Sequence, residues 1–180
     1  MVKILITESD NYSKEAIRIL ESSGKVYKKN LTYQNLLKQV SEYDVIITKL
    51  GINFDKTILS KATKLKIIAS PTTGLDHIDQ NYLKKRKVKI LSLKDEKIFL
   101  EKISATAELN FGLIIALMRN LKLAIDDVKL GNWNRKNFVG SELQKKTIGI
   151  IGLGRIGRKL AFFCKSFGMK VIYFDRSIQD

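Results

Sequence analysis

The stretch 147–175 constrains the fold of this chain most, because it combines two apolar runs, a glycine-rich turn and a helical segment. The apolar run 148–151 is typical of a buried parallel strand. Three glycines follow it with the spacing G-x-G-x-x-G, namely Gly152, Gly154 and Gly157. A helix is predicted over 155–167, with Gly168 ending it, and a second buried strand over 171–174. The stretch therefore predicts a βαβ unit whose two strands lie parallel in one sheet.

Each glycine of this turn has a separate physical task. Gly152 permits the tight turn from strand to helix, and Gly157 lets the helix pack closely against the strand. Gly154 has no side chain, so backbone N–H groups can approach a pyrophosphate, which the helix N-terminus also attracts. Asp175 lies 23 residues after Gly152, where a carboxylate can accept hydrogen bonds from both hydroxyls of a ribose. The pattern predicts a dinucleotide site; the alternative is a βαβ turn that binds nothing.

NAD is the predicted cofactor, because the Asp175 carboxylate would repel the 2′-phosphate of NADP. Arg176 follows directly and could pair with such a phosphate, which leaves NADP open as an alternative. Taken alone, the stretch predicts only that a dinucleotide can bind, and it says nothing about a reaction.

The net charge of +15 is the most unusual feature of the composition. A charge of this size would suit nucleic acid or an anionic membrane surface. The lysines are spread over the whole chain, however, and the basic clusters at 84–87 and 145–146 are short. We interpret the charge mainly as a solvated surface and expect neither nucleic acid nor a membrane as partner.

The expected location is the cytoplasm. The chain opens with M-V-K-I-L-I-T, which is a strand pattern rather than a signal peptide. The longest apolar run, 111–118, is much shorter than the ~20 residues of a membrane span. The single cysteine, Cys164, fits a reduced compartment and is expected to be a small packed residue.

The first hundred residues alternate between short apolar runs and short helical segments. Strands are predicted at 2–7, 44–50, 65–70 and 88–93, the first of them buried, and a short edge strand is predicted at 26–28. Helices are predicted at 11–22, 32–40, 55–60 and 79–85. The alternation implies a parallel sheet with helices on both faces, and we assign residues 1–100 to a flavodoxin-like α/β domain.

The longest helix is predicted over 104–129, where it leads into a second domain, 101–180. The loop 131–141 contains the only tryptophan, Trp133, and precedes the first strand of the glycine motif. With one βαβ unit after it, this domain has the form of the first half of a Rossmann domain.

Several separated segments share the features of one enzyme family. They are A-S-P-T-T-G-L-D-H-I-D at 69–79, T-A-E at 106–108 with G-L-I-I-A-L-M-R-N-L at 112–121, G-N-W-N-R at 131–135, and G-S-E-L-Q-K-K-T-I-G-I-I-G-L-G-R-I-G at 140–157. In this order and spacing the chain resembles the NAD-dependent D-isomer-specific 2-hydroxyacid dehydrogenases, near their phosphoglycerate dehydrogenase-like branch.

This resemblance implies a two-domain enzyme with its active site in the cleft between the domains. Residues 1–100 would be the substrate domain and 101–180 a truncated NAD-binding domain. The implied reaction is reversible hydride transfer between NAD and C2 of a small D-2-hydroxy or 2-oxo acid, whose identity the sequence does not indicate. A homodimer is implied too, with the helix from Ser104 contributing to the interface, although packing within its own domain would explain the same apolar pattern.

The resemblance also assigns cofactor contacts. Arg155 and Ile156 would lie against the pyrophosphate, and Asp175 would hold the adenosine ribose. Thr106 would contact the nicotinamide end of the cofactor. The plain alternative for Thr106 is that it only begins a helix.

Three residues are assigned to the substrate by the same resemblance. The backbone of Gly74 and Leu75 would hold the carboxylate, and Lys49 would be a basic or polar contact. Alternatively, Gly74 is only a turn residue with positive φ and Lys49 is a solvated lysine. The single histidine, His77, follows this turn, where the family does not place its base, so we expect it to pack in its loop.

The family's catalytic arginine, glutamate and histidine all lie well after the ribose-binding aspartate. The sequence ends at Asp180, and no position in it matches this trio, so we assign no catalytic residue and no metal site. The strand at 148–152 would also keep one edge unpaired, although the first strand of such a sheet is central. We therefore expect an N-terminal part of a longer chain that is inactive by itself.

Two other interpretations remain open at this point. One is a short protein that binds NAD without catalysis, as a sensor or interaction module. The other is a basic nucleic-acid-binding relative, as some transcriptional corepressors of the same family are.

Overall fold

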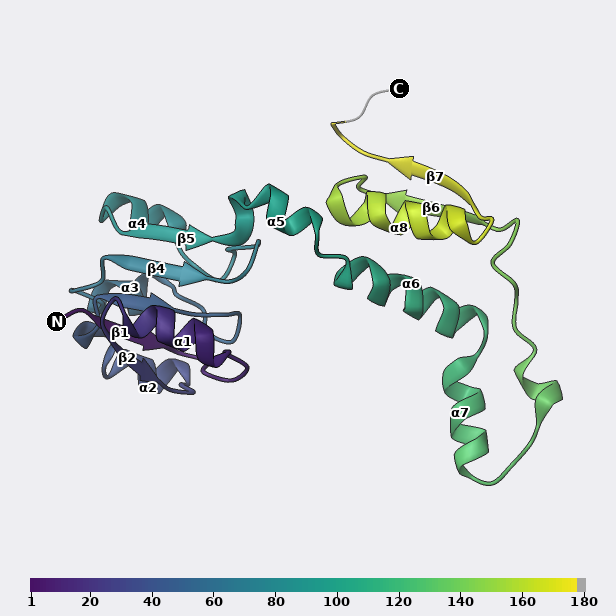
Figure 1. Ribbon diagram of the computed structural model, residues 1–180, viewed down its shortest axis with the longest axis horizontal. Helices are drawn as coiled ribbons and strands as arrows, with labels where there is room; N and C mark the ends of the chain where they lie inside the picture. Colours follow the sequence, from purple (N-terminus) through teal and green to yellow (C-terminus); the bar gives the residue numbers. More distant parts are fainter. Residues whose placement is uncertain (178–180) are drawn as a thin grey trace. The chain divides into compact units, whose positions relative to one another are not determined.

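The computed structural model describes residues 1–177 (Figure 1). The chain divides into two compact units, Met1–Lys97 and Ile98–Asp180.

Five parallel strands form the sheet of the first unit, in the order β2-β1-β3-β4-β5. They are β1 (Lys3–Ile6), β2 (Lys25–Lys28), β3 (Val45–Ile47), β4 (Ile67–Ser70) and β5 (Lys89–Ser92). This is the strand order of flavodoxin-like folds. The predicted fold class is confirmed, and β2 is an edge strand as predicted.

The four helices of this unit each begin at a side chain that caps them. The helices are α1 (Lys14–Glu21), α2 (Tyr33–Leu37), α3 (Lys56–Lys61) and α4 (Gln80–Lys85). The caps are Ser13, Thr32, Asp55 and Asp79, and each accepts a hydrogen bond from the backbone N–H three residues later. Such bonds satisfy donors that have no partner inside the helix, which fixes where each helix begins.

Side chains of alternate residues along the strands enter two separate cores. Leu5, Ile46 and Ile68 belong to the larger core, which also contains buried residues of α2, α3 and α4. Ile4, Ile6 and Ile47 belong to the smaller one, together with Ile17 of α1. The sheet therefore carries α1 on one face and the other three helices on the opposite face, because successive strand residues point to opposite sides.

The strand predicted over 44–50 is shorter in the structure, where β3 ends at Ile47. The carboxylate of Glu8 accepts hydrogen bonds from the backbone N–H groups of Lys49 at 2.6 Å and Gly51 at 2.9 Å. These donors bond to a side chain rather than to a neighbouring strand, so the chain leaves the sheet. The helix predicted over 32–40 likewise ends early, at Leu37, and a 3₁₀ turn, η1 (Val40–Glu42), follows it.

The second unit contains most of its helical residues before its sheet begins. Its elements are α5 (Lys97–Glu101), α6 (Ala105–Met118), α7 (Leu121–Lys129), the 3₁₀ turn η3 (Arg135–Phe138), β6 (Thr147–Ile151), α8 (Arg155–Ser166) and β7 (Lys170–Phe174). The short helix α5 begins at the last residue of the first unit, after the 3₁₀ turn η2 (Leu93–Asp95). No sequence pattern predicted α5. The strand–helix–strand order of β6, α8 and β7 agrees with the prediction.

The single helix predicted over 104–129 is wrong, because two helices meet at Asn120. Asn120 has the left-handed backbone conformation, with φ 52° and ψ 33°. Its side-chain amide donates to the carbonyl of Val139 at 3.2 Å. Asparagine adopts this conformation more readily than most residues, so it can end α6 and begin α7. The apolar periodicity continues through this position and by itself predicts one helix.

The core of the second unit gathers on one face of its two-stranded parallel sheet. Phe111 of α6, Leu143 and Cys164 of α8 are buried there, with Ile148 and Val171 packed against them. Cys164 is thus the small packed residue that was predicted. The other sheet face is exposed: Ile151 is 91% exposed, and Phe174 is 65% exposed. Within residues 1–177, β6 pairs only with β7.

No helix in the described part of the chain is long and apolar enough to cross a membrane.

Candidate functional site

Two of the three glycines in the turn after β6 are required by the fold itself. Gly152 has a φ of +91°, a conformation that side chains strongly disfavour. At Gly157 a Cβ atom would lie 2.2 Å from the carbonyl oxygen of Gly152, which is backbone and cannot move aside easily. Gly157 therefore lets α8 approach the end of β6, as predicted.

The third glycine, Gly154, has no such requirement. Its backbone is in the ordinary extended region, with φ −71° and ψ −165°. A Cβ atom built on it would meet no protein atom within 4 Å. The chain could carry a side chain here without strain, so the open space above Gly154 serves no internal packing. A residue without a side chain at the N-terminus of a helix leaves room for a ligand to reach the backbone.

The open space lies at the N-terminus of α8. Gly154 is the N-cap residue, and no side chain of the described residues caps this helix. The first N–H groups of a helix have no partner within it, and the helix dipole adds partial positive charge at this end. Arg155 and Ile156 form its first turn, so their backbone N–H groups are among these donors. The geometry suits a bound phosphate or other anion.

Asp175 lies directly after β7, at the end of the second strand as predicted, and its side chain contacts this turn. Its Oδ2 accepts a hydrogen bond of 2.6 Å from the backbone N–H of Leu153, and its Oδ1 accepts bonds from the N–H and the hydroxyl of Ser177. The hydroxyl and N–H of Ser177, then the N–H of Leu153, lower the pKa of Asp175 to about 2, because they stabilise the charged carboxylate. The side chain is an anion throughout the physiological range.

Ser177 was not predicted as part of this site. It stands two residues after an aspartate, which is the spacing of a turn closed by an Asp side chain. That local signal could have identified it. Its bonds use Oδ1, while Leu153 uses Oδ2, so about one of the roughly four acceptor positions of the carboxylate remains for a ligand hydroxyl.

The side chain of Arg155 lies on another part of the second unit. One of its terminal nitrogens, Nη1, donates to the carbonyls of Leu100 at 3.0 Å and Ile103 at 2.9 Å. The backbone of Arg155 stays at the helix N-terminus. No spacing rule predicts this contact, since the partners are more than fifty residues apart in sequence.

Thr106 lies in the first turn of α6 and is exposed. Its carbonyl accepts a hydrogen bond from the side chain of Asn110. The predicted contact of Thr106 with a nicotinamide ring stays a prediction.

The predicted substrate residues lie after neighbouring strands of the first unit. Lys49 follows β3, and Gly74 and Leu75 follow β4, so both segments lie at the carboxyl edge of the sheet. The ammonium group of Lys49 donates to the carbonyl of Asp10 and lies 4.9 Å from the ring centre of Tyr12. Ligands of open parallel sheets bind beyond this edge.

The turn after β4 exposes Gly74 and anchors Leu75. Gly74 is not among the residues with positive φ, which removes the simplest alternative explanation for a glycine at this position. The side chain of Leu75 is buried in the larger core, so only its backbone is available to a ligand. The Thr72 hydroxyl donates to the carbonyl of Gly74 at 2.7 Å and fixes the turn.

His77 packs within this loop. Its Nε2 lies 3.4 Å from the hydroxyl of Ser70, and its carbonyl accepts a hydrogen bond of 2.7 Å from the backbone N–H of Phe54. These contacts fix the loop to Ser70 at the end of β4 and to the backbone of Phe54.

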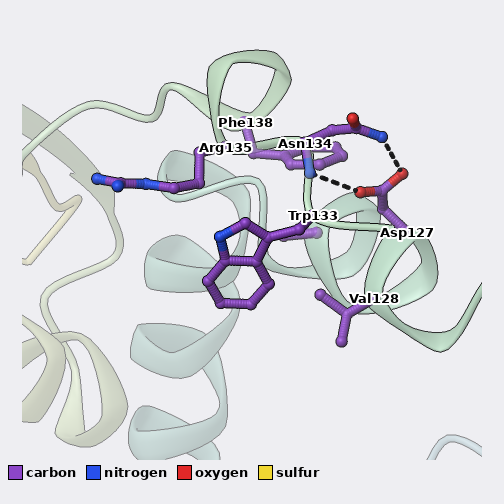
Figure 2. A pocket seen from close by; sticks show the side chains of 7 residues that line it. Asp127, Val128, Trp133, Asn134, Arg135 and Phe138 are labelled. Carbon is purple, nitrogen blue, oxygen red and sulfur yellow. Dashed lines mark hydrogen bonds between the residues drawn. The ribbon is translucent and has the colours of Figure 1, made fainter. Parts of the chain in front are cut away.

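A separate hollow of about 310 Å³ lies beside α7, around the exposed side chain of Trp133 (Figure 2). The Asp127 carboxylate holds the loop there by accepting hydrogen bonds from the N–H and the side-chain amide of Asn134. None of the predicted site residues lines this hollow.

Comparison with known protein families matches nearly the whole chain. Residues 4–97 match the family model of the D-isomer specific 2-hydroxyacid dehydrogenase catalytic domain. Residues 111–180 match the NAD binding domain of the same family.

Two curated relatives share more than a third of their aligned residues with this chain. D-3-phosphoglycerate dehydrogenase of Methanocaldococcus jannaschii is 38% identical over 176 residues, which cover 97% of this chain and 32% of the relative. Glyoxylate reductase of Pyrococcus horikoshii is 34% identical over 172 residues, covering 89% of this chain and 50% of the relative. The chain thus spans about a third to a half of the length of these relatives.

Solved structures share the fold. D-lactate dehydrogenase from Aquifex aeolicus, complexed with NAD and lactic acid, superposes with a TM-score of 0.83 at 25% identity, over 98% of this chain and 52% of that chain. A protein from Thermus thermophilus superposes with a TM-score of 0.86 at 26% identity, over 99% of this chain and 57% of that chain.

Proposed function

Because the chain belongs to the D-isomer specific 2-hydroxyacid dehydrogenase family, we propose that its second unit binds NAD at the glycine turn and its first unit holds a D-2-hydroxy acid or the matching 2-oxo acid. The match of residues 111–180 to the family's NAD binding domain confirms NAD as the predicted cofactor. NAD would supply the hydride acceptor, and the hydroxyl proton of the acid would pass to a base.

The observation that carries this proposal is the open space at Gly154. The fold requires glycine at 152 and 157, whereas at 154 it does not. A ligand that must touch the backbone supplies the missing reason, and the unpaired N–H groups at the start of α8 suit the two phosphates of NAD.

The adenosine ribose would bind at Asp175. The carboxylate is ionised and fixed by Leu153 and Ser177, so a ribose hydroxyl would meet a positioned acceptor. A 2′-phosphate at the same place would face a negative charge, which favours NAD over NADP.

The substrate carboxylate would bind to the backbone N–H groups of Gly74 and Leu75. The turn that carries them is fixed by the bond from Thr72, and its exposed glycine allows close approach. Lys49 would add positive charge at the same sheet edge, after exchanging its bond to Asp10 for one to the substrate.

A calorimetric titration of NAD into the protein and two alanine variants tests the cofactor site. Gly154→Ala should keep the melting temperature but weaken NAD binding about tenfold or more, since the methyl group occupies the space above the turn. Gly112→Ala is the matched control, because a Cβ there also meets no atom within 4 Å but lies in α6, away from the turn. Equal NAD affinity in Gly154→Ala and the control would contradict the proposed site.

We also propose that residues 1–180 by themselves bind NAD without turnover. The reaction needs a proton-transfer group at the carbinol oxygen, and the only histidine, His77, is engaged with Ser70 in its loop. NADH oxidation by the purified 180 residues with glyoxylate, pyruvate or 3-phosphohydroxypyruvate would contradict this. A module that binds NAD without any reaction remains the alternative, and assaying the gene product as the cell makes it separates the two.

Self-association is proposed through α6. This helix presents a row of exposed leucines at a spacing of four residues, Leu109, Leu113 and Leu117. Such a row lies along one face of a helix and is costly to leave in water. Analytical ultracentrifugation should show a dimer that Leu113→Glu dissociates, and an unchanged sedimentation coefficient in that variant would reject this interface.

A further inference from the structure

Three basic side chains from the first two turns of α8 hold the end of α5. Arg155 donates to the carbonyls of Leu100 and Ile103 at 3.0 and 2.9 Å. Lys159 donates to the carbonyl of Glu101 at 2.7 Å. Arg158 lies 3.6 Å from the carboxylate of Glu101. We call these contacts of Arg155, Arg158 and Lys159 the α5 clamp.

The positive side chains of the α5 clamp complement the carbonyl groups at the end of α5. The last carbonyls of a helix have no partner within it and carry partial negative charge, which cations at that end stabilise. The carbonyl of Leu100 already accepts the N–H of Ile103 at 3.0 Å, and Arg155 occupies its second acceptor position. Charged donors bind such carbonyls more strongly than neutral ones.

The α5 clamp binds residues 100–103, at the start of the second unit. The first unit ends at Lys97, α5 ends at Glu101, and α6 begins at Ala105. Between them, the carbonyls of residues 100, 101 and 103 are all bound to α8. The clamp therefore ties residues 100–104 to the helix that carries the glycine turn.

Arg155 contacts both the glycine turn, through its backbone, and the end of α5, through its side chain. It directly follows Gly154, whose open side faces the expected pyrophosphate, and its side chain reaches the end of α5. Both of its bonds come from Nη1. Among residues 1–177 its other guanidinium nitrogens have no acceptor, so they can still donate to an anion at the helix N-terminus.

We infer that Arg155 is a positioning residue that couples NAD binding to the order of residues 100–104. One guanidinium would bridge a phosphate of NAD and the carbonyls at the end of α5, so each partner strengthens the other. By thermodynamic linkage, the factor by which NAD stabilises the segment equals the factor by which the clamped segment tightens NAD. The NAD half of this inference rests on the proposed function; the clamp itself does not.

Hydrogen exchange of the full-length gene product, measured by mass spectrometry with and without NAD, tests the inference. Without NAD, Arg155→Ala should exchange the amides of Lys102 and Ile103 about tenfold faster than the wild type, because their turn loses two charged hydrogen bonds. Lys165→Ala is the matched control, since it removes an exposed positive charge from the same helix without touching α5.

NAD should slow exchange of these amides in the wild type and in Lys165→Ala, but not in Arg155→Ala. Equal exchange in Arg155→Ala and the control without NAD would overturn the clamp. Equal protection by NAD in the two variants would overturn the coupling. If NAD binds none of the proteins, the proposed function fails, while the comparison without NAD still decides the clamp. An Arg155→Lys variant, which keeps the charge and can make one of the two bonds, should restore part of the protection.

Discussion

The carboxylate of Asp175 accepts a 2.6 Å hydrogen bond from the backbone N–H of Leu153, which lies between two glycines of the turn. The side chain expected to hold a ribose therefore also fixes the loop expected to hold the phosphates. A substitution at Asp175 should therefore affect both functions.

The pH dependence of NAD binding should show no titration of Asp175 between pH 5 and 8. In the folded protein the pKa of Asp175 is about 2, below the ordinary carboxyl value. The ionised carboxylate therefore stabilises the folded loop at every pH above that ordinary value, and this stabilisation is lost as the pH falls toward 2. Asp175→Asn should weaken NAD binding about tenfold at every pH in the range. Titration calorimetry across pH 5–8 checks this, and a wild-type midpoint within that window would assign the titration to a different group.

Cofactor preference should depend on the opposed charges of Asp175 and Arg176. Asp175→Ala should lower the affinity for NAD. It should also raise the ratio of NADP affinity to NAD affinity about tenfold, because the repelling carboxylate is gone while Arg176 remains. The double variant with Arg176→Ala should lose the gain for NADP. Fluorescence titration with both reduced cofactors measures the ratio, and a ratio that is unchanged in Asp175→Ala would exclude this basis for the preference.

Gly157→Ala should destabilise the second unit, in contrast to Gly154→Ala. The new methyl group would lie 2.2 Å from the carbonyl oxygen of Gly152, so α8 must shift away from β6 at a cost of roughly 1–3 kcal/mol. Thermal unfolding followed by circular dichroism measures the difference. The order of stability, with Gly154→Ala above Gly157→Ala, is the decisive outcome, and the reverse order would refute the description of the turn.

Asn120 should tolerate glycine better than valine. Its φ of 52° costs a β-branched residue roughly 1–2 kcal/mol, whereas glycine adopts it freely and loses only the side-chain bond to Val139. Asn120→Val should therefore lower the melting temperature more than Asn120→Gly. If valine is tolerated as well as glycine, α6 and α7 form one continuous helix in solution.

Much of this fold could be predicted from local signals. The caps at Ser13, Thr32, Asp55 and Asp79 are residue types whose side chains accept backbone hydrogen bonds, and the strands are short β-branched runs. The glycine turn was predictable because Gly152 and Gly157 each meet a steric demand of the fold, while Gly154 leaves the backbone open. The match to the family confirms the resemblance that these motifs indicated.

Other features depend on contacts that no local pattern encodes. The end of β3 is set by Glu8 through its bonds to Lys49 and Gly51, which lie 41 and 43 residues after it. The break at Asn120 depends on one backbone conformation within an apolar run that continues on both sides. The α5 clamp joins Arg155 to carbonyls, which every residue has, so sequence offers no signal for the acceptors.

The cores of the two units share no residue: those of the first unit lie within 4–90, and that of the second within 111–171. Cooperative unfolding follows a shared core, so heating should melt the protein in two steps rather than one. A change such as Gly157→Ala should then lower one melting step and leave the other in place. In evolution the same independence lets either half accumulate substitutions, or be exchanged for another, without requiring the other half to repack.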